Sequence, residues 1–135
     1  MTTKPLLTAV LTLVAALPAL AVEVDQICAE AEERYVELFG EPSDALQDAE
    51  VVLMYKYHFC PAQITVKPGT TVRWVNVDKR TSHSVLLKDG GQPESDRIFP
   101  EESVEMTFVE PGPQDYLCGP HWETQNMVGM VTVEP

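Results

Sequence analysis

Three side chains that bind soft metals lie within ten residues of one another near the end of the sequence. They are the thiol of Cys118, the imidazole of His121 and the thioether of Met127, and a second imidazole, His83, comes 35 residues before the cysteine. Two imidazoles and a thiolate in a trigonal set, with a weak thioether beyond them, suit copper that exchanges one electron. Such a ligand set matches the preferences of neither oxidation state of copper fully, so the geometry of the site changes little on electron transfer.

Short extended segments surround these residues. From Val51 onward, runs of β-branched, aromatic and apolar residues are bounded by Pro, Gly, Asn and Asp, which is typical of β-strands. Within Thr71–Asn76, for example, Val72, Trp74 and Asn76 share one face, as alternation in a strand requires. The segments expected as strands are Val51–Tyr57, Gln63–Lys67, Thr71–Val77, Ser84–Leu87, Ser103–Phe108, Asp115–Cys118 and Val128–Glu134.

Turn signals separate several of these strands, at Lys67-Pro68-Gly69, Asp89-Gly90-Gly91 and Pro111-Gly112-Pro113. Seven short strands within about 85 residues predict an all-β fold, either an antiparallel β-sandwich or a small barrel. In this arrangement Cys118, His121 and Met127 share the loop between the last two strands. His83 approaches that loop from the start of an earlier strand.

One helix is expected ahead of the strands, over Asp25–Phe39. Ile27, Ala31 and Tyr35 recur at helical spacing, acidic residues crowd the first turns, and Gly40 followed by Pro42 ends the pattern. This helix is not required for a β-sandwich, so it is an addition to the fold.

The N-terminus has the form of a secretory leader. A short segment with one positive charge precedes the apolar run Leu6–Leu17, and Ala19-Leu20-Ala21 matches a signal-peptidase site. Cleavage after Ala21 leaves eight basic and 21 acidic residues, a net charge of −13. Such a surface disfavours nucleic acid and anionic lipid, and the run of about a dozen apolar residues is too short to span a membrane. We expect an exported, periplasmic protein without membrane insertion.

The order of these motifs resembles the cupredoxin family, in particular plastocyanin and pseudoazurin. The resemblance extends from Val51 to Glu134. The matching segments are Phe59-x-Pro61-x-x-Ile64-x-Val66-x-Pro68-Gly69-x-x-Val72-x-Trp74-x-Asn76-x-Asp78, His83-Ser84-Val85, Pro111-Gly112, Tyr116-x-Cys118-x-Pro120-His121 and Met127-Val128-Gly129-x-Val131-x-Val133.

Membership of this family would imply a Greek-key β-sandwich with one copper ion, held by His83, Cys118, His121 and Met127. The chain then divides into a signal peptide at residues 1–21, an N-terminal helical extension at residues 22–49 and a cupredoxin domain at residues 50–135. We expect a monomer.

The sequence departs from the plastocyanin pattern at two positions near the metal. Five residues separate His121 from Met127, one more than in the pattern, and Met130 is a rival for the fourth ligand. Met127 is preferred because Met130 would lie inside the closing strand. In addition, Ser84 follows the first histidine where the family often has asparagine, and its hydroxyl can make a similar, shorter bond to the backbone near Gly119.

The remaining two cysteines need a separate account, because export exposes them to an oxidising compartment. A disulfide between Cys28 and Cys60 would attach the added helix to the first strands. The alternatives are free thiols, or a second soft-metal site that includes His58 and Met54.

Enzyme classes fit the sequence poorly. Copper oxidases and nitrite reductases commonly flank the copper cysteine with histidines, whereas Leu117 and Gly119 flank Cys118. A dinuclear copper domain would need a cysteine at position 114, where the chain has Gln114. A catalytic zinc site would need an open water position and a nearby acid or base, and Glu123 alone does not provide one. We expect a protein that is not an enzyme.

Two functions remain open. The first is one-electron transport by a blue or green copper site, with His121 as the electron route and Trp122, Pro120 and Met127 as a docking patch for a partner such as a cytochrome, a basic one given the acidic surface. The second is copper sequestration or tolerance at the same site, together with other copper-handling proteins. The added helix, the longer loop, and the segments Arg80–His83 and Glu94–Arg97 resemble small exported copper-resistance cupredoxins.

Overall fold

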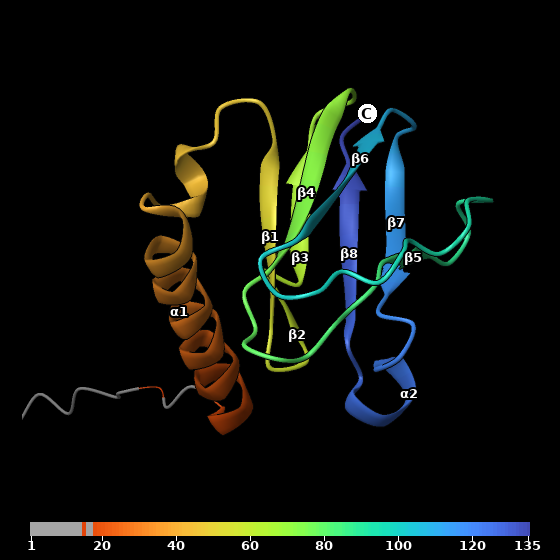
Figure 1. Cartoon of the computed structure of the whole chain (residues 1–135). Helices are drawn as coiled ribbons and strands as arrows, with labels where there is room; N and C mark the ends of the chain where they lie inside the picture. The colour runs from red at the N-terminus through yellow and green to blue at the C-terminus, as the bar shows by residue number, and fades with distance from the viewer. Residues whose placement is uncertain (1–14, 16–17) are drawn as a thin grey trace, which may run out of the picture.

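Two four-stranded sheets pack face to face, and one long helix lies against the outside of the first sheet (Figure 1). The computed structural model describes residue 15 and residues 18–135. The strand orders are β2-β1-β4-β6 and β3-β8-β7-β5. The elements are α1 (Ala19–Phe39), a 3-10 turn η1 (Ser43–Ala45), β1 (Glu50–Tyr55), β2 (His58–Cys60), β3 (Gln63–Val66), β4 (Thr70–Asn76), β5 (Leu86–Leu87), β6 (Ser103–Phe108), β7 (Gly112–Leu117), α2 (Trp122–Gln125) and β8 (Val128–Val133).

Alternation along β1 and β4 divides their side chains between two cores. Val52, Met54 and Trp74 face the second sheet and belong to the main core. Leu53 and Val75 face the opposite way and pack with side chains of α1. The helix therefore covers the outer face of the first sheet, and this is why β1 has a run of four buried residues where a half-exposed strand would alternate.

The expected all-β sandwich with an added helix is confirmed, but two strand pairings are parallel. β1 pairs in parallel with β4, and β3 with β8. The chain crosses to the second sheet at β3 and returns at β4, so β4 runs in the same direction as β1. The expectation of antiparallel pairing was wrong for these two pairs and correct for the other four among the described residues.

The segment expected as one strand over Val51–Tyr57 contains β1 and the turn of a hairpin whose second strand, β2, was not predicted. β1 ends at Tyr55, the backbone turns at Lys56 (φ 47°) and Tyr57 (φ 64°), and β2 pairs back on β1. Left-handed conformations at such turns are usually taken by Asn or Gly, and this turn contains neither. The sequence therefore carried no signal for it.

The last strands also differ from expectation at their ends. β7 begins at Gly112 rather than Asp115, and Pro113 lies within it, opposite Thr132. Proline is tolerated because β5 pairs only with the end of β7, at Tyr116 and Leu117, so no partner strand needs the missing N–H group.

The helix is longer than expected and ends as predicted. It begins at Ala19 rather than Asp25, and Gly40 (φ 83°) ends it by donating its backbone N–H to the carbonyl of Val36 at 2.8 Å. The expected leader, residues 1–21, lies mostly outside the described residues. Among the described residues, no helix has the length and apolar character needed to cross a membrane.

Candidate metal centre

Three of the predicted ligand side chains meet at one end of the sandwich. His83 comes from the connection between β4 and β5, Cys118 directly follows β7, and His121 precedes α2. Their ligand atoms all lie within 4.8 Å of one another, and this is the one such group among the described histidine, cysteine and acidic residues. Cys118 and His83 are completely buried.

The distances fit a single metal ion between these side chains. The sulfur of Cys118 lies 3.7 Å from Nδ1 of His83 and 3.4 Å from Nδ1 of His121. A first-row metal bound at ~2.0–2.3 Å from nitrogen and sulfur in a trigonal plane would hold these atoms roughly 3.7 Å apart. The donor set therefore fits a small ion coordinated by one thiolate and two Nδ1 atoms.

A buried carboxylate fixes the orientation of His83. Nε2 of its ring lies 2.6 Å from Oδ2 of Asp78, which leaves Nδ1 facing the sulfur. Asp78 is itself held, because its Oδ1 accepts a bond from the backbone N–H of Lys56 at 3.2 Å and its own N–H donates to Asn76. Such an outer partner sets ring orientation and ligand basicity. The sequence pattern contained Asp78 but gave it no role.

The pKa values of the two imidazoles shift in opposite directions. Burial of His83 opposes protonation, but its hydrogen bonds with Asp78 and Cys118 outweigh that effect and raise its pKa above the ordinary value. Burial, followed by the positive charges of His83 and Arg97, lowers the pKa of His121. His121 is therefore readily neutral, which is the form of imidazole that binds a metal.

Backbone hydrogen bonds shape the loop that carries Cys118. Its carbonyl accepts bonds from the N–H groups of His121 at 3.1 Å and Trp122 at 2.9 Å, and its own N–H donates to the carbonyl of Met127 at 3.0 Å. The sulfur accepts the backbone N–H of Ser84 at 3.4 Å. A hydrogen bond to the sulfur is one of the features that tune a thiolate metal site.

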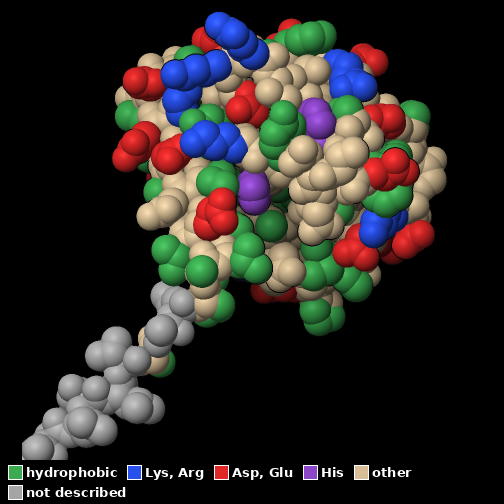
Figure 2. Space-filling model, turned by 90° about the horizontal axis from the view of Figure 1, so that it is seen from below, with side chains coloured by type: hydrophobic (Ala, Val, Ile, Leu, Met, Phe, Trp, Pro, Cys, Tyr) green, Lys and Arg blue, Asp and Glu red, His purple; other side chains and the backbone are tan. Residues whose placement is uncertain are grey.

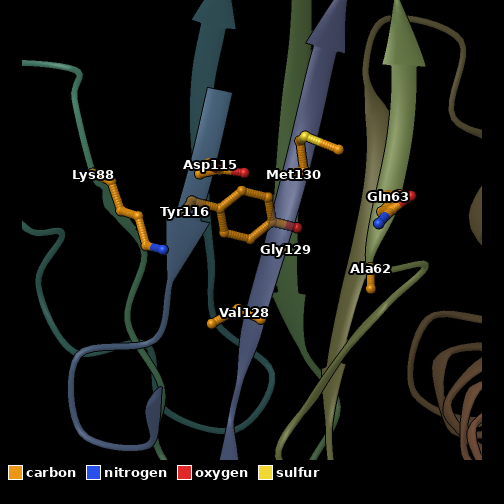
Figure 3. A pocket seen from close by; sticks show the side chains of 8 residues that line it. All are labelled: Ala62, Gln63, Lys88, Asp115, Tyr116, Val128, Gly129 and Met130. Atoms are coloured by element: carbon orange, nitrogen blue, oxygen red, sulfur yellow. The ribbon is translucent and has the colours of Figure 1, made fainter. Parts of the chain in front are cut away.

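Met127, and not Met130, lies beside this loop. Met127 is 1% exposed and its N–H donates to the carbonyl of His121 at 3.4 Å. Met130 pairs with Asp115, which at ~3.3 Å per residue is roughly 10 Å along β7 from Cys118. Figure 3 shows Met130 at a shallow cavity beside Gly129 and Tyr116. Its side chain therefore belongs to the surface of the second sheet.

The surface around His121 differs from the expected docking patch. Met127 is buried and contributes nothing to it. Trp122 is 44% exposed, and Tyr57, which sequence reasoning missed, is 37% exposed with its ring 4.9 Å from that of His121. Histidine side chains reach the surface at this end of the molecule among apolar and charged groups (Figure 2).

The alternative of a second metal site is not supported. Cys28 and Cys60 form a disulfide, so neither thiol is available. His58 pairs with Tyr55 and Met54 with Phe59 across the hairpin, which places Met54 and His58 on opposite faces of the sheet. Met54 lies in the main core.

The comparisons with known proteins identify the family. A family model described as copper binding proteins of the plastocyanin/azurin family matches residues 49–134. The chain belongs to this family. The expected resemblance to cupredoxins is thus confirmed, and the cofactor is copper, for which the buried thiolate and two imidazoles are a suitable donor set.

Individual relatives agree with this placement. Amicyanin from Paracoccus versutus is 34% identical over 96 residues, covering 68% of this chain and 70% of that protein. Halocyanin from Natronomonas pharaonis is 35% identical over 107 residues, covering 70% and 63%. The crystal structure of Paracoccus versutus amicyanin superposes with a TM-score of 0.58 at 35% identity, over 67% of this chain and 86% of that one.

Proposed function

We propose that this cupredoxin is a one-electron carrier whose type 1 copper is bound by His83, Cys118, His121 and Met127. The observation that supports the proposal most directly is a buried unpaired thiol with an imidazole nitrogen on each of two sides, at 3.4 and 3.7 Å. Structures of amicyanin variants described as a reduced Cu(I) form and as an oxidized form are similar to this chain, with TM-scores of 0.58. Bound copper would supply the exchange between its cuprous and cupric states.

The protein itself fixes the positions of the ligands and shields them from water. Asp78 fixes one ring, backbone hydrogen bonds fix the loop from Cys118 to His121, and Met127 is buried beside this loop. Little rearrangement is then needed when the charge of the metal changes. His121 is the half-buried ring at the surface, and we assign it as the route of the electron to a partner such as a cytochrome.

We further propose that the protein is exported to the periplasm, that residues 1–21 are removed, and that it acts as a monomer. The apolar N-terminal run and the Ala-Leu-Ala site support cleavage, and the disulfide between Cys28 and Cys60 suits an oxidising compartment. The helical extension at residues 22–49 would stay attached to the copper domain through that disulfide. We propose no enzymatic activity, since the residues beside Cys118 provide no second copper ligand.

A redox titration tests the carrier function. The copper-loaded protein should be reduced and reoxidised reversibly with a one-electron Nernst slope and one electron per copper, followed through its visible absorption. A protein that binds copper but shows no reversible one-electron step would contradict the proposal.

Copper tolerance is the second candidate, and the added helix supports it. The helix lies outside residues 49–134, the part of the chain that the family model matches, so it is an addition to the shared copper domain. Deleting the gene and growing cells across a series of copper concentrations separates the two functions. Copper sensitivity of the deletion strain would favour sequestration or tolerance, whereas normal growth at every copper level would exclude it.

A further inference from the structure

Ser84 connects the two segments that carry the proposed copper ligands. It follows His83, is completely buried, and its backbone N–H donates to the sulfur of Cys118 at 3.4 Å. Its hydroxyl oxygen also accepts the backbone N–H of Gly119 at 2.9 Å. The sequence predicted a bond from this hydroxyl to the backbone near Gly119, and the structure confirms it.

A carboxylate completes this connection. The hydroxyl of Ser84 donates to Oε1 of Glu94 at 2.5 Å. A serine hydroxyl rotates and can be donor or acceptor, whereas an ionised carboxylate only accepts. Glu94 therefore accepts the hydrogen bond from the hydroxyl, and a lone pair of the hydroxyl oxygen faces the N–H of Gly119. A charged acceptor also makes the bond stronger than a neutral one.

The position of Glu94 is built into the fold. Ser95, the next residue, is held to Val85 by two hydrogen bonds, from the Val85 N–H to the Ser95 hydroxyl at 2.9 Å and from the Ser95 N–H to the Val85 carbonyl at 3.0 Å. These bonds keep the segment from Glu94 onward alongside the segment that follows His83.

The absence of a side chain at Gly119 leaves the space that the carboxylate of Glu94 occupies. A β-carbon at this position would lie 1.9 Å from Oε1 of Glu94 and 3.0 Å from the hydroxyl oxygen of Ser84. A side chain larger than glycine directly after Cys118 would therefore displace the carboxylate of Glu94 from this contact.

We propose that Glu94 is a positioning residue for the copper site and acts through Ser84 on the loop of Cys118. It fixes the hydroxyl that holds Gly119, and its negative charge stabilises the more positive cupric state. Glu94 thereby slows copper loss and lowers the reduction potential. The inference rests on the proposed copper-binding function.

Two substitutions separate the hydrogen bond from the charge. Glu94→Gln keeps an acceptor for Ser84 but removes the charge, so it should raise the reduction potential while copper loss to a cuprous chelator stays near the wild-type rate. Glu94→Ala removes both and should raise the potential and also speed copper loss about tenfold, at the lower end of effects of outer-shell changes. Glu110→Ala, an equal change of charge on the β6–β7 connection, is the matched control.

A double-mutant cycle tests whether Glu94 acts through Ser84. In a Ser84→Ala background, Glu94→Ala should produce little further change in copper loss. Ser84→Asn, whose amide carries its own acceptor, should make copper loss insensitive to Glu94→Ala. Far-ultraviolet circular dichroism and Tm confirm that each variant is folded.

Failure of this inference can be distinguished from failure of the proposed function. If Glu94→Ala matched Glu110→Ala in potential and copper loss, or if it speeded copper loss equally with and without Ser84, this inference would be wrong and the proposed copper site would be unaffected. If the wild-type protein bound copper without visible colour, the proposed function itself would fail.

Discussion

The two imidazoles of the site are held in different ways, and this difference determines what each can do. His83 is buried and fixed by Asp78 at 2.6 Å. His121 is half-buried, has Tyr57 against its ring and is positioned by the loop backbone. One ring is therefore fixed in the interior, and the other lies at the surface.

Asp78 should matter for copper affinity although it is not a ligand. Asp78→Ala removes the group that orients His83 and should lower the affinity 10–100-fold, the usual range for an outer-shell partner. Competition with a chromophoric chelator measures this effect. Asp48→Ala, in an exposed connection, should change nothing, and an equal loss in both variants would contradict a specific role for Asp78.

The fourth ligand is tested by two methionine substitutions. Met127→Leu should keep copper bound and raise the reduction potential, because it removes an electron-donating ligand from the cupric ion and the axial ligand tunes this potential. Met130→Leu, on the second sheet opposite Asp115, should leave the potential unchanged. A shift in the Met130 variant alone would reverse the assignment.

Sequence reasoning reached the residues with distinctive chemistry but not those that position them. The spacing of Cys118, His121 and Met127 is visible in the sequence because they share one loop. Glu94 and Tyr57 carry no such signal, since exposed glutamate and tyrosine are common in loops. Their roles depend on where the folded connections bring them.

At the scale of elements, α1 is the part of the chain that the sandwich does not require. It covers Leu53 and Val75 on the first sheet, and the disulfide joins it to β2. Arg34 donates a hydrogen bond from Nε to the carbonyl of Val77 at 3.3 Å. The ion pairs of Arg34 with Glu37 and of Lys56 with Glu30 lie at the surface and contribute little. Burial, the disulfide and the hydrogen bond of Arg34 attach the helix to the sheet.

Replacing both disulfide cysteines should destabilise the fold without altering the metal site. Cys28→Ala combined with Cys60→Ala should lower the free energy of unfolding by ~2–4 kcal/mol, as measured by denaturant titration. The visible spectrum should not change. Thiol titration of the denatured, metal-free wild type should find one thiol, and a count of three would contradict the disulfide.

The elements themselves were predictable to different degrees. Strands with clear alternation, such as Ser103–Phe108, were predicted with the correct ends. The hairpin at Lys56 and Tyr57 was missed because its turn has no Gly or Asn. The expected strand Ser84–Leu87 shrinks to two residues, because Ser84 bonds to Cys118 and Gly119 instead of to a neighbouring strand.

At the scale of the whole molecule, charge is the dominant surface property. The chain has 21 acidic and nine basic residues, a net charge of −12. Long-range attraction should therefore guide a positively charged partner, while the small exposed area around His121 limits the lifetime of the complex.

This electrostatic steering predicts a salt dependence. Electron exchange with a basic cytochrome should slow as ionic strength rises from about 10 mM to about 200 mM, because salt screens the attraction. Stopped-flow absorbance measures the rate. An acidic cytochrome is the control and should respond in the opposite direction, and a rate that is independent of salt with both partners would contradict steering by net charge.

The most direct test of the copper centre is the visible spectrum of the purified protein before and after Cys118→Ser. The wild type loaded with cupric ion should absorb intensely through sulfur-to-copper charge transfer, near ~600 nm for a blue site and with an added band toward ~450 nm for a green one. The serine variant should lose this absorption. Colourless copper binding by the wild type, or colour that persists in the Cys118→Ser variant, would contradict the account.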